Sequence, residues 1–233
     1  MGLQIPPPEI MAAMIIVIFF AIGIHEYSHC KFADMAGDPT PRFYGRVTLN
    51  LFKHFEPIGT LMMVLSSLTG LGLGWGKPAP INPAKMANPR VDTFIAVAAG
   101  PVSNLVQAII YGLFFRLALQ SGNLNAFLID GALTRSGTTF VAALLTLGVL
   151  LNLSLFAFNL IPFGPLDGHW LVGLLMPDPY RTRWFQFSRT YGWQILIAVI
   201  LFSQIAHVPI LSRIMFPVIA FFFKLITGVP IIG

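Results

Sequence analysis

The chain has 233 residues, of which 56% are hydrophobic and only 10% are charged, whereas soluble domains carry roughly 25% charged residues. So few charges cannot cover a water-exposed globule, and the high hydrophobicity excludes intrinsic disorder, so the composition predicts an integral protein of a lipid bilayer. The net charge is +5, but the basic residues are scattered between apolar segments without a patch of interleaved aromatic residues, so no nucleic-acid partner is expected.

Five apolar segments are each long enough to cross a bilayer at ~1.5 Å per residue. The first segment has no charge from residue 10 to residue 24 and continues to about residue 31. The other segments lie between Asp92 and Arg116, between Arg135 and Asp167, between Arg189 and Arg213, and from Ile214 onward with Lys224 as the one interruption. The pattern predicts a polytopic all-α helical bundle with five transmembrane helices.

A sixth apolar segment, residues 58–73, is shorter and rich in glycine. Basic residues precede it and follow it, and the positive-inside tendency places both sets in the cytoplasm. We therefore predict that this segment is a re-entrant hairpin, that the N-terminus lies outside and that the C-terminus lies inside. If the segment crossed fully, the bundle would have six crossings and the loop charges would conflict.

Two segments between the predicted helices are expected to be extended. Residues 46–51 alternate polar and apolar side chains, which predicts a short cytoplasmic β-strand. Residues 77–83 contain three prolines, each of which disfavours helix at the residue before it. We expect a single domain over residues 1–233, with a core over about 10–175 and C-terminal helices over about 190–230.

The first apolar segment ends in His25-Glu26-Tyr27-Ser28-His29, the His-Glu-x-x-His arrangement. Residues four apart share one helix face, so the two imidazoles converge, and Glu26 lies beside them. Three ionisable side chains in a membrane span are costly without a partner, at roughly 2.5 to 3.5 kcal/mol for each charge. This cost favours a zinc site with an adjacent base over a structural polar cluster.

A catalytic zinc site usually has three protein ligands and one water, so a third ligand is needed. Asp167 is the candidate, because it follows a long apolar run in which Pro162 and Pro165 interrupt the helix. Gly164 and Gly168 tolerate unusual backbone angles, which would let the carboxylate turn into a cavity. Spacing alone leaves a second interpretation open, in which Asp167 is a carboxylate at the membrane surface that faces the basic loop.

These residues resemble the site-2 protease family of intramembrane zinc metalloproteases, bacterial type. The matching segments are the His-Glu-x-x-His motif at 25–29, Ala-Gly-Pro-Val-Ser-Asn-Leu at 99–105, and the segment from Asn159 to Gly168. Residues 38–50, 57–60 and 77–83, together with His54, also resemble the compact branch of the family without PDZ domains.

The resemblance implies that His25, His29 and Asp167 bind one Zn²⁺ per chain and that Glu26 is the catalytic base. Two further side chains match family positions beside the site, where they would hold a substrate carbonyl or oxyanion or would serve as interhelical hydrogen-bond partners: Asn104 and Asn159. His54 is a further candidate that would approach the site from the cytoplasmic segment.

The function expected from the resemblance is hydrolysis of peptide bonds within or near a transmembrane segment. The implied substrate is a single-span membrane protein, cleaved in a bacterial inner membrane with the active site toward the cytoplasm. Ile81 and Asn82 lie in the extended segment 77–83, which could capture an unwound substrate by edge pairing.

Two alternative functions use the same residues. A membrane metal-ion transporter also needs His and Asp within its spans, but it has no need for Glu26 beside two ligands. A non-catalytic zinc-binding scaffold would keep the ligands but would have no reason to keep the base.

Overall fold

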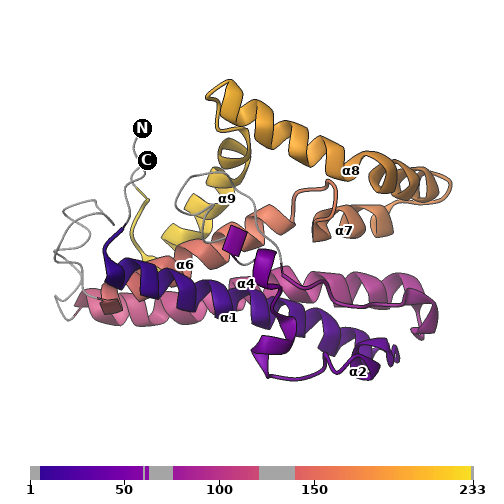
Figure 1. Ribbon diagram of the computed structural model, residues 1–233, viewed down its shortest axis with the longest axis horizontal. Helices are drawn as coiled ribbons and strands as arrows, with labels where there is room; N and C mark the ends of the chain where they lie inside the picture. The colour runs from indigo at the N-terminus through magenta and orange to yellow at the C-terminus, as the bar shows by residue number, and fades with distance from the viewer. Residues whose placement is uncertain (1–5, 60, 63–75, 121–139, 232–233) are drawn as a thin grey trace.

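The computed structural model describes residues 6–59, 61–62, 76–120 and 140–231. In these residues the regular structure consists of α-helices and short 3-10 helices, so the predicted all-α class is confirmed (Figure 1).

The prediction of a strand at residues 46–51 is wrong, because bends cover 47–49 and the 3-10 helix η1 (Leu51–His54) follows. Thr48 explains the difference, since its hydroxyl accepts a hydrogen bond from the Asn50 amide and its carbonyl accepts one from His54 Nε2. These local bonds take the place of pairing with a second strand.

Three long helices form the centre of the bundle: α1 (Pro8–Met35), α4 (Pro89–Gln120) and α6 (Phe140–Asn159). They lie side by side, and each packs against the other two (Figure 1). Several alanines are completely buried between them, namely Ala13, Ala21, Ala96, Ala108 and Ala143. Small side chains let helix backbones approach closely, which favours packing where lipid surrounds the helices.

Three further helices follow α6: α7 (Asp167–Leu175), α8 (Tyr180–Ile205) and α9 (Ile210–Thr227). The short α7 packs against α4 and α8, and α9 packs against α6, α4 and α8. In Figure 1, α8 extends along the side of the molecule that is remote from α1. The chain therefore surrounds the space beside α1 and α6 with α7, α8 and α9.

Four of the described helices are long and apolar enough to cross a membrane: α1, α4, α6 and α9. The prediction of five crossings is thus not supported, because α8 is not apolar enough over a sufficient length to count as a membrane-spanning helix. Its first half carries Arg181, Arg183 and Arg189, and the helix ends at Ile205 before a turn at His207 with φ 52°. The apolar part that remains, residues 190–205, spans only ~24 Å at 1.5 Å per residue, less than the ~30 Å of a hydrocarbon core.

The predicted re-entrant hairpin, residues 58–73, lies largely outside the described residues. Its flanks show that the chain leaves α1 and returns to the same end of that helix, since the Ala87 amide donates to the Ala36 carbonyl at 3.2 Å. Between these points, η1 lies beside the middle of α1, where the Phe52 and Phe19 rings are 5.0 Å apart. A chain that reaches the middle of α1 and comes back is compatible with re-entry, which remains a prediction.

Asp38 fixes the segment that returns to the end of α1, and its side chain is fully buried. One carboxylate oxygen accepts a hydrogen bond from the Thr40 amide at 3.0 Å, and the other accepts one from the Asn82 amide at 2.6 Å. The carboxylate thus joins the connection after α1 to the extended segment 77–82.

Replacement of Asp38 by Ala should lower the free energy of unfolding by about 3 kcal/mol, because two partly buried backbone amides lose a charged acceptor. Thermal unfolding of purified protein in detergent micelles measures the effect. Lys53→Ala is the control, since it removes an exposed charged side chain in the same connection and should shift the melting temperature much less. Equal melting temperatures for the wild type and Asp38→Ala would contradict this role.

Candidate metal centre

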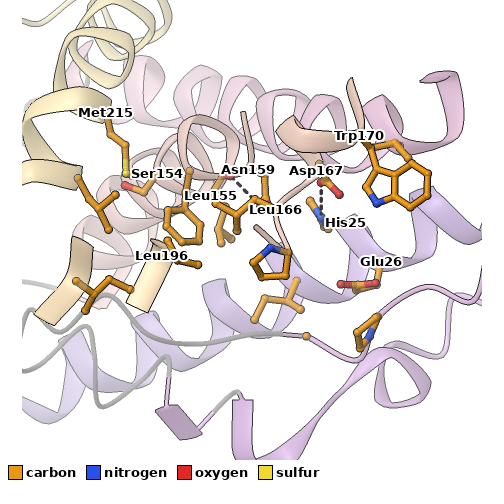
Figure 2. A pocket seen from close by; sticks show the side chains of 18 of the residues that line it. His25, Glu26, Ser154, Leu155, Asn159, Leu166, Asp167, Trp170, Leu196 and Met215 are labelled. Atoms are coloured by element: carbon orange, nitrogen blue, oxygen red, sulfur yellow. Dashed lines mark hydrogen bonds and ion pairs between the residues drawn. The ribbon is translucent and has the colours of Figure 1, made fainter. Parts of the chain in front are cut away.

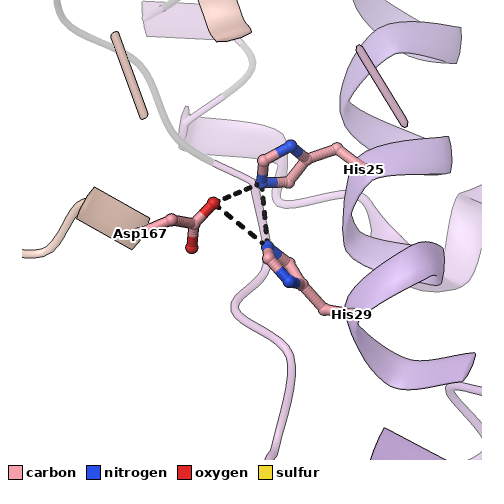
Figure 3. A group of neighbouring side chains, drawn as sticks. All are labelled: His25, His29 and Asp167. Carbon is pink, nitrogen blue, oxygen red and sulfur yellow. Dashed lines mark hydrogen bonds and ion pairs between the residues drawn. The ribbon is translucent and has the colours of Figure 1, made fainter. Parts of the chain in front are cut away.

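His25 and His29 project from one face of α1 toward the first residue of α7, Asp167 (Figure 3). The two Nε2 atoms are 3.0 Å apart, and each lies 3.3 Å from Asp167 Oδ2. Both histidines are buried. The structure therefore brings together the three side chains that the sequence suggested as ligands.

Hydrogen bonds from α4 fix which nitrogen of each imidazole carries the proton. His25 Nδ1 lies 2.7 Å from Asn104 Oδ1, and His29 Nδ1 lies 2.9 Å from the Ala96 carbonyl oxygen. Asn104 Oδ1 is the acceptor, because Asn104 Nδ2 donates to the Ala21 carbonyl and to Asn152 Oδ1. Since both partners of the imidazoles accept, each Nδ1 donates, and in the neutral ring each Nε2 presents a lone pair.

Two imidazole lone pairs and one carboxylate oxygen therefore face a common point. Among the described residues, no donor forms a hydrogen bond to the buried Asp167 Oδ2. In a tetrahedral zinc site, ligand atoms about 2.0–2.1 Å from the metal are about 3.3 Å from one another, close to the separations found here. The residues fit a zinc ion with His₂Asp ligation and one open position.

Asp167 reaches the histidines because the chain turns sharply after α6. As the sequence suggested, α6 ends at Asn159 before Pro162, and α7 begins at Asp167 after a seven-residue turn. Gly168 is needed for this approach, since a Cβ atom there would be 2.4 Å from the Ile161 carbonyl oxygen. The backbone of the turn thus packs directly against the start of α7.

Gly100 in α4 provides the space that the two imidazoles occupy. A Cβ atom at this position would lie 2.3 Å from His29 Nε2 and 2.8 Å from His25 Cε1. This role of Gly100 is not evident from the sequence motif alone. The available signal was a Gly-Pro pair, Gly100-Pro101, inside an otherwise apolar helix, because a glycine in such a helix often marks a close packing contact.

A cavity of about 880 Å³ opens from the metal centre between α1, α6, α8 and the connection to α9 (Figure 2). Its wall is mostly apolar and includes Ile18, Ile22, Leu155, Phe158, Leu196 and Met215. Glu26 lines the same cavity, and Figure 2 shows its carboxylate at the end where His25 and Asp167 lie. Its buried Oε2 has no hydrogen-bond partner among the described residues.

Of the five remaining candidates, Asn159 and Ile81 line the cavity. Asn159 Nδ2 donates to the Leu155 carbonyl one turn earlier in α6. Asn104 is fully buried behind His25, outside the cavity lining. Its contacts support a role in orienting the imidazole.

His54 and Asn82 also lie outside the cavity lining. His54 is buried, and burial lowers the pKa of its imidazole. The Asn82 side chain accepts a hydrogen bond from the Ala84 amide and thereby caps the 3-10 helix η2 (Pro83–Lys85). Both residues thus have structural contacts near the extended segment 77–82.

Arg46 holds the beginning of this extended segment, a role that the sequence did not predict. Its guanidinium donates to the Lys77 carbonyl at 2.6 Å, to the Pro78 carbonyl at 3.3 Å and to His54 Nδ1 at 3.4 Å. The residue is only 4% exposed. With Asp38 at Asn82, two buried charges fix both ends of a segment whose middle part borders the cavity.

An open ligand set that fits zinc, with a neighbouring carboxylate and carried by apolar helices, is the arrangement expected of a membrane metalloprotease. Residues 121–203 match the family model "Peptidase family M50". The chain is 32% identical over 213 residues to "Putative zinc metalloprotease YwhC" of Bacillus subtilis, a match that covers 91% of this chain and 88% of that protein. It is 26% identical over 225 residues to "Putative zinc metalloprotease Rip2" of Mycolicibacterium smegmatis, covering 94% and 77% of the two chains. No solved structure matches the chain.

The chain belongs to peptidase family M50, the site-2 protease family, and is a zinc metalloprotease of the membrane.

Replacement of Gly100 by Ala should reduce zinc affinity at least about tenfold, because the added methyl group overlaps both imidazole rings. Metal analysis of purified protein after dialysis against a weak chelator measures this loss. Gly112→Ala is a matched control on the same helix, since its methyl group would meet Ile226 of α9, away from the histidines. Full zinc content in Gly100→Ala would show that the rings do not need this space.

Proposed function

We propose that the chain is an intramembrane protease that cleaves single-span membrane proteins within or near their transmembrane segments. One Zn²⁺ per chain is held by His25, His29 and Asp167, and Glu26 is the general base. The observation that carries the proposal is the convergence of three ligand atoms within 4.8 Å of one another, beside Glu26, which lines one end of an apolar cavity and whose Oε2 has no hydrogen-bond partner among the described residues.

Zinc supplies Lewis acidity, which polarises a peptide carbonyl and makes water more acidic. Glu26 takes the proton of the attacking water and delivers it to the nitrogen of the leaving amine. Asn104 and the Ala96 carbonyl hold the imidazoles in the tautomer that directs both Nε2 atoms at the metal position. Asn159, which lines the cavity, is in a position to hydrogen-bond the substrate backbone.

The site lies inside the membrane part of α1. His29 is six residues, or ~9 Å, from the end of the helix at Met35. The connection that leaves this end carries Arg42, Arg46 and Lys53, and the positive-inside tendency assigns such a connection to the cytoplasm. We place the active site toward the cytoplasmic face of a bacterial inner membrane, in a single catalytic domain.

The extended segment 77–82 is the part of the chain best placed to hold an unwound substrate. Ala79 and Ile81 line the cavity that Glu26 also lines. Pro78 and Pro80 have no amide hydrogen, so a substrate strand would pair here mainly with carbonyl groups. A helical substrate hides its own carbonyls in hydrogen bonds, and binding in an extended form would expose the scissile one.

The alternatives of a metal transporter and a zinc scaffold are less well supported. Both relatives are named as zinc metalloproteases, and Glu26 is present beside the ligands. Neither alternative explains why the Glu26 carboxylate, which lines the cavity, has a buried oxygen without a hydrogen-bond partner among the described residues.

Replacement of Glu26 by Gln should reduce cleavage of a model transmembrane substrate at least about 100-fold, because the amide cannot accept the proton of water. Zinc content should remain that of the wild type. Reconstituted enzyme and a fluorescent single-span substrate in vesicles give the rate, and metal analysis gives the occupancy. Glu9→Gln, an exposed position in the first turn of the same helix, is the matched control. Cleavage at the wild-type rate by Glu26→Gln would refute the assignment.

Replacement of Ile81 or Asn82 by Ala should slow cleavage without loss of zinc, since these residues belong to the segment proposed to hold the substrate. The same cleavage assay and metal analysis test this expectation. Lys85→Ala, an exposed change in the neighbouring η2, should leave both quantities unchanged. Wild-type rates in both the Ile81 and the Asn82 variants would exclude the segment as a substrate clamp.

A further inference from the structure

The helix that carries Asp167 is held at its opposite end by Arg90, in the first turn of α4. Arg90 Nε donates to the Leu174 carbonyl at 2.7 Å. Arg90 Nη2 donates to the Leu175 carbonyl at 3.2 Å and to the Met176 carbonyl at 3.0 Å. One guanidinium therefore contacts three successive carbonyls at the end of α7.

These contacts suit the chemistry of a helix C-terminus. The last carbonyls of a helix have no partner within the helix, and they carry the negative end of the helix dipole. A guanidinium has a positive charge and several donors in a fixed planar arrangement, so it satisfies more than one carbonyl at once. Arg90 thus provides the polar part of the contact between α4 and α7.

The same helix, α4, also orients the two histidines. It supplies the Ala96 carbonyl to His29, the Asn104 side chain to His25, and the space at Gly100. The carboxylate comes from α7, which packs against α4. Arg90 therefore connects the helix that orients two of the ligands to the helix that carries the third.

We propose that Arg90 is a positioning residue of the metal centre, which sets the distance between Asp167 and the imidazole pair. This inference rests on the proposed ligand role of Asp167. α7 has nine residues and is only ~13 Å long, so a shift at its last turn is transmitted to its first residue. Metal–ligand distances tolerate changes of only about 0.2 Å, so a small movement of α7 weakens the site.

The chain contains a matched control for this interaction. Arg116 is located near the other end of α4, and its Nη2 donates to the Leu225 carbonyl at 2.7 Å, close to the end of α9. As with Arg90, an arginine side chain donates a hydrogen bond to a backbone carbonyl near the end of a helix, but none of the proposed metal ligands lies on α9. Loss of Arg116 should disturb the bundle without moving Asp167.

The experiment compares zinc dissociation constants of full-length protein in detergent, measured by competition with a chelator. Arg90→Ala should raise the dissociation constant about tenfold, and Arg116→Ala should change it less than about twofold. Arg90→Lys should give an intermediate value, because an ammonium keeps the charge but loses the planar arrangement of donors. Melting temperatures of the zinc-free proteins separate the effect on the site from general destabilisation.

The outcomes distinguish a wrong ligand assignment for Asp167 from a wrong positioning role for Arg90. If Asp167→Ala binds zinc like the wild type, the proposed ligand set is wrong. If Asp167→Ala loses zinc but Arg90→Ala keeps wild-type affinity, the role of Arg90 is overturned, as it also is if Arg90→Ala and Arg116→Ala lose affinity equally. Should Arg90→Ala fail to fold, the comparison of Arg90→Lys with Arg116→Lys decides in the same way.

Discussion

The convergence of two imidazole lone pairs and one carboxylate oxygen on a single point inside a membrane bundle is the constraint on which the rest depends. Without a cation, these three acceptors would repel one another in a region of low dielectric constant. The surrounding helices keep them together. α4 fixes the tautomer of both rings and leaves room for them at Gly100, while the turn after α6 brings Asp167 to the same point. The contacts that pack α4 against the neighbouring helices thus also orient the proposed metal ligands.

Much of the helical architecture could be predicted from the sequence, because long apolar segments have few alternatives in a bilayer. Five of the predicted segments correspond to α1, α4, α6, α8 and α9. The number of crossings could not be predicted in the same way. The absence of charge between Arg189 and Arg213 does not show where a helix ends. The turn at His207 ends the apolar part of α8 before it is long enough to cross a membrane. The prediction of a strand at 46–51 was wrong for a similar reason, since alternation of polar and apolar side chains does not show whether a partner strand exists.

The site could be predicted only in part. The His-Glu-x-x-His spacing gives the histidines and Glu26 from helix geometry alone. Asp167 is far from them along the chain, so its position depends on the whole bundle, and the resemblance to a family was the stronger indication. Arg46 and Arg90 had no local signal, because each acts by contacting backbone groups distant in sequence, and the same holds for the contact of Asp38 with the Asn82 amide. Such contacts depend on tertiary structure and leave no periodic pattern.

The size of the cavity limits which polypeptides can react. A helix with its side chains is about 10–12 Å wide and rises ~5.4 Å per turn, so about 880 Å³ corresponds to less than two turns. If the chain cleaves transmembrane segments, as proposed, the cavity would hold only a short part of such a segment at a time, and that part would have to be unwound for Glu26 to reach its carbonyl group. Selection would then depend on how easily a segment loses its internal hydrogen bonds, so that glycine or proline near the scissile bond matters more than the identity of the flanking side chains.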